Sequence, residues 1–183
     1  MLIEKFNIEG PLLITPRIFP DDRGYFFESY NEQLFQSQGL TARFVQDNQS
    51  CSKKNVLRGL HYQAPPFDQG KLVRVVKGSV IDIAVDIRKG SPTYGQHLRI
   101  SLDAISQKMF WIPPGFAHGF LSLEDDTIFL YKCTNVYHKE SEGGIIWNDP
   151  ALNIDWGVSH PLVSPKDLEL PELRNIETPF RYA

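Results

Sequence analysis

The sequence predicts a mainly β protein, an antiparallel barrel or jelly roll with extra N-terminal strands and a few short helices. Short runs in which apolar and polar residues alternate recur along the chain, as is typical of strands. Turn residues separate these runs at regular intervals, which favours a sandwich or a barrel. The length of 183 residues fits one domain. We therefore expect a single domain over residues 1–183, with a barrel core at about residues 44–135 and flanking segments that wrap around it or reach a partner subunit.

The clearest strand covers residues 81–87, where Ile and Val alternate with Asp82, Ala84 and Asp86. This period of two predicts a half-buried strand. Similar runs lie at residues 71–76, 97–102, 108–112, 119–123 and 127–134, and turns are expected at 77–78, 89–90, 113–115 and 124–126.

Two short helices are expected outside the barrel. The first covers residues 31–38, with Asn31 as its N-cap and Gly39 just past its end. The second begins at Ser164, where a capping serine, Pro165 and the acid Asp167 form a helix-start pattern.

Composition restricts the classes of function. The net charge is 19 − 22 = −3, and no run of five basic residues exists, so a nucleic-acid binder is not expected. No apolar run approaches the roughly 18 residues of a membrane helix, and the N-terminus does not have the pattern of a signal peptide. Cys51 and Cys133 are far apart and form no CxxC pair, so we expect free thiols in a cytoplasmic protein.

The densest group of chemically useful residues is the string VLRGLHYQ at positions 56–63. In a regular strand, Gly59, His61 and Gln63 share one face, with Arg58 on the other. His61 is a candidate general base, because histidine exchanges protons at physiological pH; the alternative is a hydrogen-bonded core histidine. Lys71, at the start of the next strand, either stabilises a developing oxyanion or is an exposed strand-end lysine.

The string WIPPGFAHGF at positions 111–120 is similar to the second sequence motif of cupins, a jelly-roll class whose first motif normally supplies further metal ligands. Here Gln63 stands where a second histidine is expected, and Lys71 and Arg74 occupy the stretch that should hold an acid. A metal site usually needs at least three protein ligands. We therefore expect a cupin without a metal, in which His118 orients groups or polarises a carbonyl.

Three other strings carry candidate residues. Tyr131 is a neutral proton donor or a packing tyrosine of the barrel wall. In DDRGYFFE, Arg23 is a candidate phosphate ligand and Glu28 a candidate acceptor from a nucleobase, although the string is also typical of a turn before a strand.

The amides of the Gln46-Asp47-Asn48 stretch suit the reading of a base, or they cap a loop after the strand-like residues 43–45. Asp167 either caps the last helix or orients His61. His97, His138 and His160 have no supporting neighbours and are expected to be structural or on the surface.

Together the strings resemble the dTDP-4-dehydrorhamnose 3,5-epimerase family. The resemblance runs in order from about residue 3 to residue 166 and rests on FPDDRGYFFES, FVQDNQS, VLRGLHYQ, QGKLVRVVKG, VDIRKGSPTYG, WIPPGFAHGF, FLYKCTNVY and IIWNDP. The combination of VLRGLHYQ with WIPPGFAHGF is much more specific than either string alone.

The resemblance implies a role for each candidate. It implies that His61 is the base, that Tyr131 is the acid on the opposite face, that Asp167 pairs with the base and that Lys71 stabilises the enolate oxygen. The resemblance assigns diphosphate, nucleotide and further substrate contacts to Arg23, Arg58, Glu28, Gln46, Asp47, Asn48, His118, Glu142 and Lys166. Family members are homodimers with exchanged N-terminal strands, so Arg23 and Glu28 are expected to serve the partner's site.

The implied reaction inverts C3 and C5 of dTDP-4-dehydro-6-deoxy-D-glucose on the route to dTDP-L-rhamnose, a precursor of lipopolysaccharide or cell-wall polysaccharide. Both carbons lie next to the ketone, so a base and an acid suffice and no cofactor is expected. The alternatives are an epimerase of C3 alone, a related ketoisomerase, a metal-dependent cupin dioxygenase and a protein that only binds the nucleotide sugar. Phe19, Phe26 and Tyr137 are the candidates for stacking on thymine.

Overall fold

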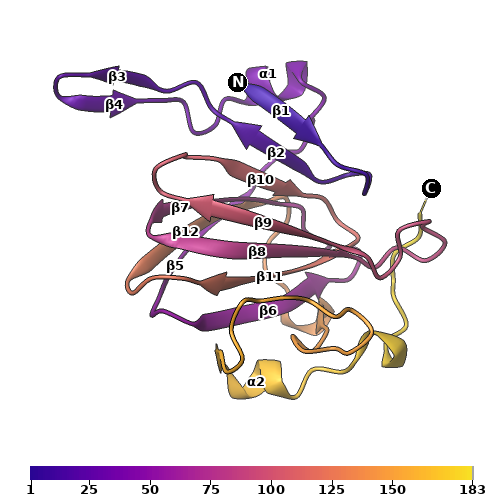
Figure 1. Cartoon of the computed structure of the whole chain (residues 1–183). Helices are drawn as coiled ribbons and strands as arrows, with labels where there is room; N and C mark the ends of the chain where they lie inside the picture. Colours follow the sequence, from indigo (N-terminus) through magenta and orange to yellow (C-terminus); the bar gives the residue numbers. More distant parts are fainter. Residues whose placement is uncertain (183) are drawn as a thin grey trace.

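The computed structural model describes residues 1–182 as a mainly β fold built from two packed antiparallel sheets (Figure 1). Its elements are β1 (Leu2–Lys5), β2 (Leu12–Thr15), β3 (Phe19–Asp21), β4 (Gly24–Phe26), α1 (Glu32–Ser37), β5 (Gln46–Ser52), β6 (Val56–Gln63), β7 (Lys71–Lys77), β8 (Ser79–Asp86), β9 (His97–Asp103), β10 (Met109–Ile112), β11 (Phe116–Ser122), β12 (Thr127–Cys133), β13 (Glu142–Gly144), β14 (Leu162–Val163) and α2 (Pro165–Leu168). Short 3₁₀ turns cover Lys139–Ser141 and Leu173–Asn175. The predicted fold class is confirmed.

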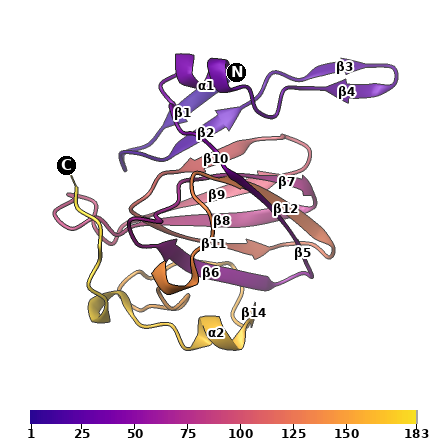
Figure 2. The ribbon, with the colours of Figure 1, turned by 180° about the vertical axis from the view of Figure 1, so that it is seen from behind.

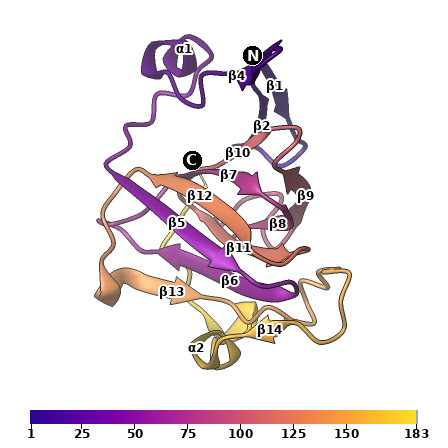
Figure 3. The ribbon, with the colours of Figure 1, turned by 90° about the vertical axis from the view of Figure 1, so that its left-hand side faces the viewer.

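The two sheets face each other across the interior of the barrel. One has the strand order β1-β2-β10-β7-β12-β5 and the other β13-β6-β11-β8-β9, with β14 added parallel to β6. Viewed from the side, β5 and β12 lie above β6 and β11, and the strands surround a common interior (Figure 3). The eight strands from β5 to β12 span residues 46–133, close to the predicted barrel core, and β1 and β2 are the predicted extra N-terminal strands.

Apolar side chains fill the closed part of the interior. Val73, Val75, Phe110 and Phe129 belong to the buried cluster between the sheets. A second cluster covers the outer side of the β6–β11–β8 sheet, where residues of the C-terminal segment such as Trp156 pack against β8. The C-terminal segment with α2 therefore forms a layer beneath this sheet, as the view from behind shows (Figure 2).

Strand β8 is more buried than its sequence pattern predicts. Ile81, Ile83 and Val85 face the C-terminal layer, and the other face, with Asp82, points into the barrel. Both Asp82 and Asp86 are 0% exposed, so the expected half-buried strand is wrong. The reason is that this strand lies between two layers and its acids find partners inside the protein rather than in water.

Both predicted helices are present. Asn31 accepts a hydrogen bond from the backbone N–H of Leu34, and Gly39 follows the C-cap with a φ of +87°. Ser164 accepts from the N–H of Asp167 at the start of α2. The cysteines form no disulfide within residues 1–182, with Cys51 exposed and Cys133 buried. Among the same residues, no helix is long and apolar enough to cross a membrane.

The β3–β4 hairpin projects from the body as an arm (Figure 1). Its two strands pair only with each other, and Phe19, Tyr25 and Phe26 on it are 46%, 59% and 66% exposed. Exposed aromatic side chains gathered on one projecting segment are typical of an interaction surface.

Candidate active site

Two adjoining cavities open between the sheets, and three of the predicted catalytic residues line both of them. The deep cavity, named for the buried Asp167 and His118 in its lining, has a volume of about 360 Å³. The outer cavity, which the exposed Tyr137 lines, has a volume of about 330 Å³, and the two share His61, Lys71 and Tyr131. Each volume falls in the range of roughly 300–1,000 Å³ that small-molecule sites occupy. The three side chains come from β6, β7 and β12, so both sheets contribute to the junction.

His61 is held by a buried carboxylate. Its Nε2 lies 2.7 Å from Oδ1 of Asp167, whose side chain is only 5% exposed. Burial raises the pKa of Asp167, but the hydrogen bond and the electrostatic attraction of the His61 side chain outweigh it and hold this pKa below the usual range of a carboxyl group. An ionised carboxylate only accepts hydrogen bonds, so Nε2 carries the proton. Nδ1 is then left with the free lone pair that a base requires.

The α2 helix and a glycine position this carboxylate. Asp167 donates its backbone N–H to the capping Ser164, while its Oδ2 accepts from the N–H of Gly59 at 3.3 Å. Gly59 has a φ of +131°, and a Cβ built there lies 2.5 Å from the Cα of Gly119. Only glycine fits this close approach of β6 and β11. Of the two alternatives for Asp167, its side chain takes the contact with His61, while Ser164 supplies the cap.

We expect Asp167→Asn to lower kcat by about 100-fold or more and to change the KM by only a few-fold. The neutral amide cannot stabilise the protonated imidazole and no longer selects its tautomer. Steady-state kinetics measures both parameters.

The same carboxylate should make the stability of the protein depend on pH. Because the pKa of Asp167 is lowered in the folded state, the charged carboxylate stabilises the fold above its unfolded pKa of about 3.9, and this stabilisation is lost as the pH falls through the lower folded value.

Unfolding by urea at several pH values gives a second readout. The difference in the free energy of unfolding between wild type and Asp167→Asn should be constant near neutral pH and shrink at acid pH. A variant that keeps the wild-type kcat would show that this carboxylate does not assist the base.

Lys71 and Tyr131 present polar atoms that have no hydrogen-bond partner among residues 1–182. Burial lowers the pKa of Lys71, against the opposing effects of Cys133, Asp82 and Glu142. Burial raises the pKa of Tyr131, which therefore stays protonated at neutral pH. A lysine in such a place readily donates to an oxyanion, and the phenol is a neutral proton donor.

His118 forms a second histidine–carboxylate pair, which the sequence patterns did not reveal. Its Nε2 lies 3.0 Å from both oxygens of Asp82, and the two side chains are 8% and 0% exposed. Burial raises the pKa of Asp82, while His118 and Lys71 oppose this shift. His118 and His61 are directly opposite each other on β11 and β6. In the sequence, Asp82 and Asp86 alternate with apolar residues, and this pattern predicted a solvent-exposed face rather than a buried pair.

The deep cavity also receives two cations, Arg58 and Lys166. Arg58 donates from Nε to Oγ of Ser52 at 3.2 Å. Regular alternation put Arg58 on the face opposite His61, and that prediction is wrong. The register of β6 against β11 shifts between His118 and Phe120, and such an irregularity turns both side chains into the same cavity.

Amide, phenol and carboxylate groups surround the outer cavity. Gln46 and Asn48 line it and lie within β5, not in the alternative loop after residues 43–45. Tyr137 and Glu142 line it as well. Glu142 accepts from the hydroxyl of Tyr137 at 2.9 Å and from the ammonium of Lys166 at 2.6 Å. These contacts join the rims of the two cavities.

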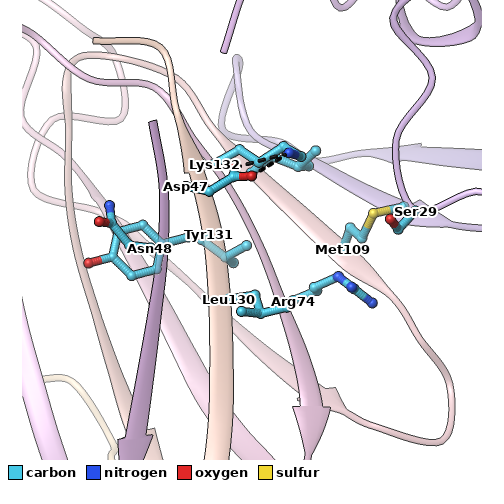
Figure 4. A pocket seen from close by; sticks show the side chains of 10 residues that line it. Ser29, Asp47, Asn48, Arg74, Met109, Leu130, Tyr131 and Lys132 are labelled. Atoms are coloured by element: carbon cyan, nitrogen blue, oxygen red, sulfur yellow. Dashed lines mark hydrogen bonds and ion pairs between the residues drawn. The ribbon is translucent and has the colours of Figure 1, made fainter. Parts of the chain in front are cut away.

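Asp47 points away from the outer cavity, unlike its sequence neighbours Gln46 and Asn48. Its carboxylate binds the ammonium of Lys132 at 3.0 Å on the outer face of the sheet. Figure 4 shows Asn48 and Tyr131 together on one side of the strands, and Asp47 and Lys132 on the other. The alternation of side chains along β5 and β12 explains this separation.

Arg23 and Glu28 also lie away from the cavities of their own chain. The Arg23 side chain, 90% exposed, pairs with Asp21 at the tip of the arm, and Glu28 accepts from Asn31 at 3.1 Å. Of the thirteen predicted site residues, the structure thus gathers ten around the two cavities and leaves Arg23, Glu28 and Asp47 outside. Within residues 1–182, no three His, Cys, Asp or Glu side chains are arranged to hold a metal ion.

Comparison with known proteins identifies the family. The profile of the dTDP-4-dehydrorhamnose 3,5-epimerase family matches residues 5–175. The dTDP-4-dehydrorhamnose 3,5-epimerase of Salmonella typhimurium is 52% identical over 175 residues, which cover 94% of this chain and 96% of that protein.

Solved structures agree with this result. The dTDP-6-deoxy-D-glucose-3,5-epimerase of Legionella pneumophila, crystallised with dTDP-4-keto-L-rhamnose, superposes with a TM-score of 0.95 at 47% identity and covers 100% of this chain and 98% of its own. A 3'-monoepimerase of Streptomyces bikiniensis, crystallised with dTDP-quinovose, has a TM-score of 0.87 at 33% identity, over 92% and 86% of the two chains. The chain therefore belongs to the dTDP-4-dehydrorhamnose 3,5-epimerase family of isomerases.

Proposed function

We propose that this protein inverts C3 and C5 of dTDP-4-dehydro-6-deoxy-D-glucose and releases dTDP-4-dehydro-L-rhamnose. The observation that carries the proposal is the meeting of His61, Lys71 and Tyr131 at the junction of the two cavities. These are the base, the oxyanion stabiliser and the acid that two successive enolate steps require. The sequence identity of about 50% to 3,5-epimerases favours this reaction over inversion of C3 alone.

In the proposed mechanism, Nδ1 of His61 removes the proton from a carbon next to the ketone. The electrons move to the ketone oxygen, and Lys71 stabilises the resulting enolate. Tyr131 then returns a proton to the other face of the same carbon, which inverts the centre. Asp167 keeps His61 oriented and stabilises its charged form through the 2.7 Å hydrogen bond. Both hydrogens are acidified by the same ketone, so one set of residues serves both carbons.

The remaining predicted residues are proposed to bind the nucleotide sugar. Arg58, His118 and Lys166 line the deep cavity, and Gln46, Asn48 and Glu142 line the outer one. The carboxylate of Asp47 is left out, because it is paired on the other face of the sheet. For the thymine ring, Tyr137 is the candidate that lines the outer cavity of its own chain, with a 55% exposed side chain.

A homodimer with exchanged N-terminal segments is part of the proposal. The projecting arm carries exposed aromatic residues, and Arg23 and Glu28 lie outside their own site. We expect sedimentation at about twice the chain mass of 20.9 kDa. Phe26→Asp on the arm should shift the protein towards the monomer, because a buried charge opposes association.

A matched control for the arm is Tyr94→Asp, at an exposed aromatic residue outside it, which should leave the mass unchanged. A Phe26→Asp protein that retains the wild-type mass would contradict the role of the arm. We further propose a cytoplasmic protein that serves polysaccharide synthesis, in keeping with its two unpaired cysteines.

Product analysis tests the reaction itself. Proton NMR of the sugar after incubation with dTDP-4-dehydro-6-deoxy-D-glucose should show inverted configurations at C3 and C5. Inversion at C3 alone would assign the protein to the single-centre epimerases, represented by the structure from Streptomyces bikiniensis.

A further inference from the structure

Ser50 is a half-buried residue that lines the deep cavity, and the mechanism does not use it. It lies on β5, on the same face as Gln46, Asn48 and Ser52, and directly opposite Phe129 on β12. Its hydroxyl oxygen has an exposed area below 1 Å² and no hydrogen-bond partner within residues 1–182. An enclosed hydroxyl without a partner is costly, so native proteins seldom retain one without a use for it.

The other polar side chains on this face of β5 all have partners. Gln46 accepts from the N–H of Tyr137 and donates to Asn48. Asn48 donates to the sulfur of Cys133. Ser52 accepts from Arg58. Ser50 is thus the exception in a strand face that is otherwise fully engaged.

The surroundings of Ser50 indicate the ligand that completes it. Arg58 and Lys166 line the same cavity, and both are positively charged. Only two contacts of the Arg58 guanidinium are made within residues 1–182, to Ser52 and to the carbonyl of Cys51, so several of its five donors remain for a ligand. Two cations and a hydroxyl donor suit an oxyanion.

We propose that Ser50 donates a hydrogen bond to a diphosphate oxygen of the nucleotide sugar, next to Arg58. The inference rests on the proposed function for the identity of the ligand. It adds a binding residue that acts when the ligand fills the deep cavity. The unpartnered hydroxyl then destabilises the free enzyme, and the hydrogen bond to the bound diphosphate removes this penalty.

This account predicts opposite effects of Ser50→Ala on stability and on binding. Removing the unpartnered hydroxyl should leave the Tm of the ligand-free enzyme unchanged or higher. Loss of a hydrogen bond to a charged oxygen should weaken the binding of dTDP by about 10- to 100-fold. Binding of thymidine, which has no phosphate, should stay within twofold. Differential scanning fluorimetry and calorimetric titration measure these quantities.

Two further variants make the test specific. Ser101→Ala makes the same change at an exposed position of β9 and should alter neither quantity. Ser50→Cys keeps the shape of the side chain with a slightly larger atom and donates only weakly, so it should also weaken dTDP binding while the fold is retained.

Three results would overturn the inference: unchanged dTDP affinity in both Ser50 variants, an equal loss of thymidine affinity, or a lowered Tm that accounts for the weaker binding. Failure of the proposed function would be seen separately, as absence of epimerisation by the wild-type enzyme. The dTDP and thymidine titrations do not depend on turnover.

Discussion

His61→Ala should lower kcat by at least about 10²–10⁴-fold, the usual contribution of general acid–base catalysis, and leave dTDP binding within a few-fold. The variant loses the imidazole that joins the buried Asp167 to the junction of the cavities. Of the proposed nucleotide-binding groups, Gln46 and Asn48 lie on β5, and Arg58 on β6 is held by Ser52, so they keep their positions. Stopped assays of product formation and calorimetric titration with dTDP measure the two effects.

His160→Ala is the matched control, because His160 is exposed and lies outside both cavities. It should behave as the wild type. A collapse of dTDP binding in His61→Ala would instead mean that His61 is a ligand contact or a structural residue, and the assignment of the base would be wrong.

Tyr131→Phe should separate proton removal from inversion. Without the phenol, the proton cannot be returned from the opposite face, and product formation should fall by about 10²–10⁴-fold. His61 remains and can give a solvent-derived proton back to the face from which it took one. Its side chain is 28% exposed, so the proton exchanges with water. In deuterated water we therefore expect deuterium in recovered substrate of unchanged configuration.

Mass spectrometry of the recovered substrate and NMR of its configuration measure these two outcomes. Phenylalanine retains the ring, so packing against Phe129 is preserved. A variant that forms product at the wild-type rate would remove Tyr131 from the mechanism. Loss of both exchange and product would assign it to the first proton transfer rather than the second.

The strands of the barrel and the chemistry at its centre were largely predictable from the sequence. Period-two alternation and turn residues located the strands from Lys71 to Cys133 closely. The resemblance to the epimerases supplied roles for His61, Lys71 and Tyr131, and the structure brings these side chains to one junction. Local patterns were sufficient to place Lys71 and Tyr131 in strands β7 and β12, and the resemblance was needed for the roles.

Other features depend on contacts between distant segments, which local patterns do not encode. Asp82 looked like part of a solvent face until β11 placed His118 beside it. The face of Arg58 followed from a register shift that alternation does not predict. The pairing of Asp167 with His61 spans 106 residues, and the spacing of the residues left it undecided. The unpartnered hydroxyl of Ser50 is visible only when all neighbouring strands are in place.

The most direct test of the account is proton NMR of dTDP-4-dehydro-6-deoxy-D-glucose with the wild-type enzyme in deuterated water, without added metal. Two enolates formed at one site predict deuterium at both C3 and C5, with both centres inverted in the product. Deuterium at C3 alone would restrict the chemistry to one centre. Absence of deuterium at both carbons would contradict the enolate mechanism that His61, Lys71 and Tyr131 are proposed to perform.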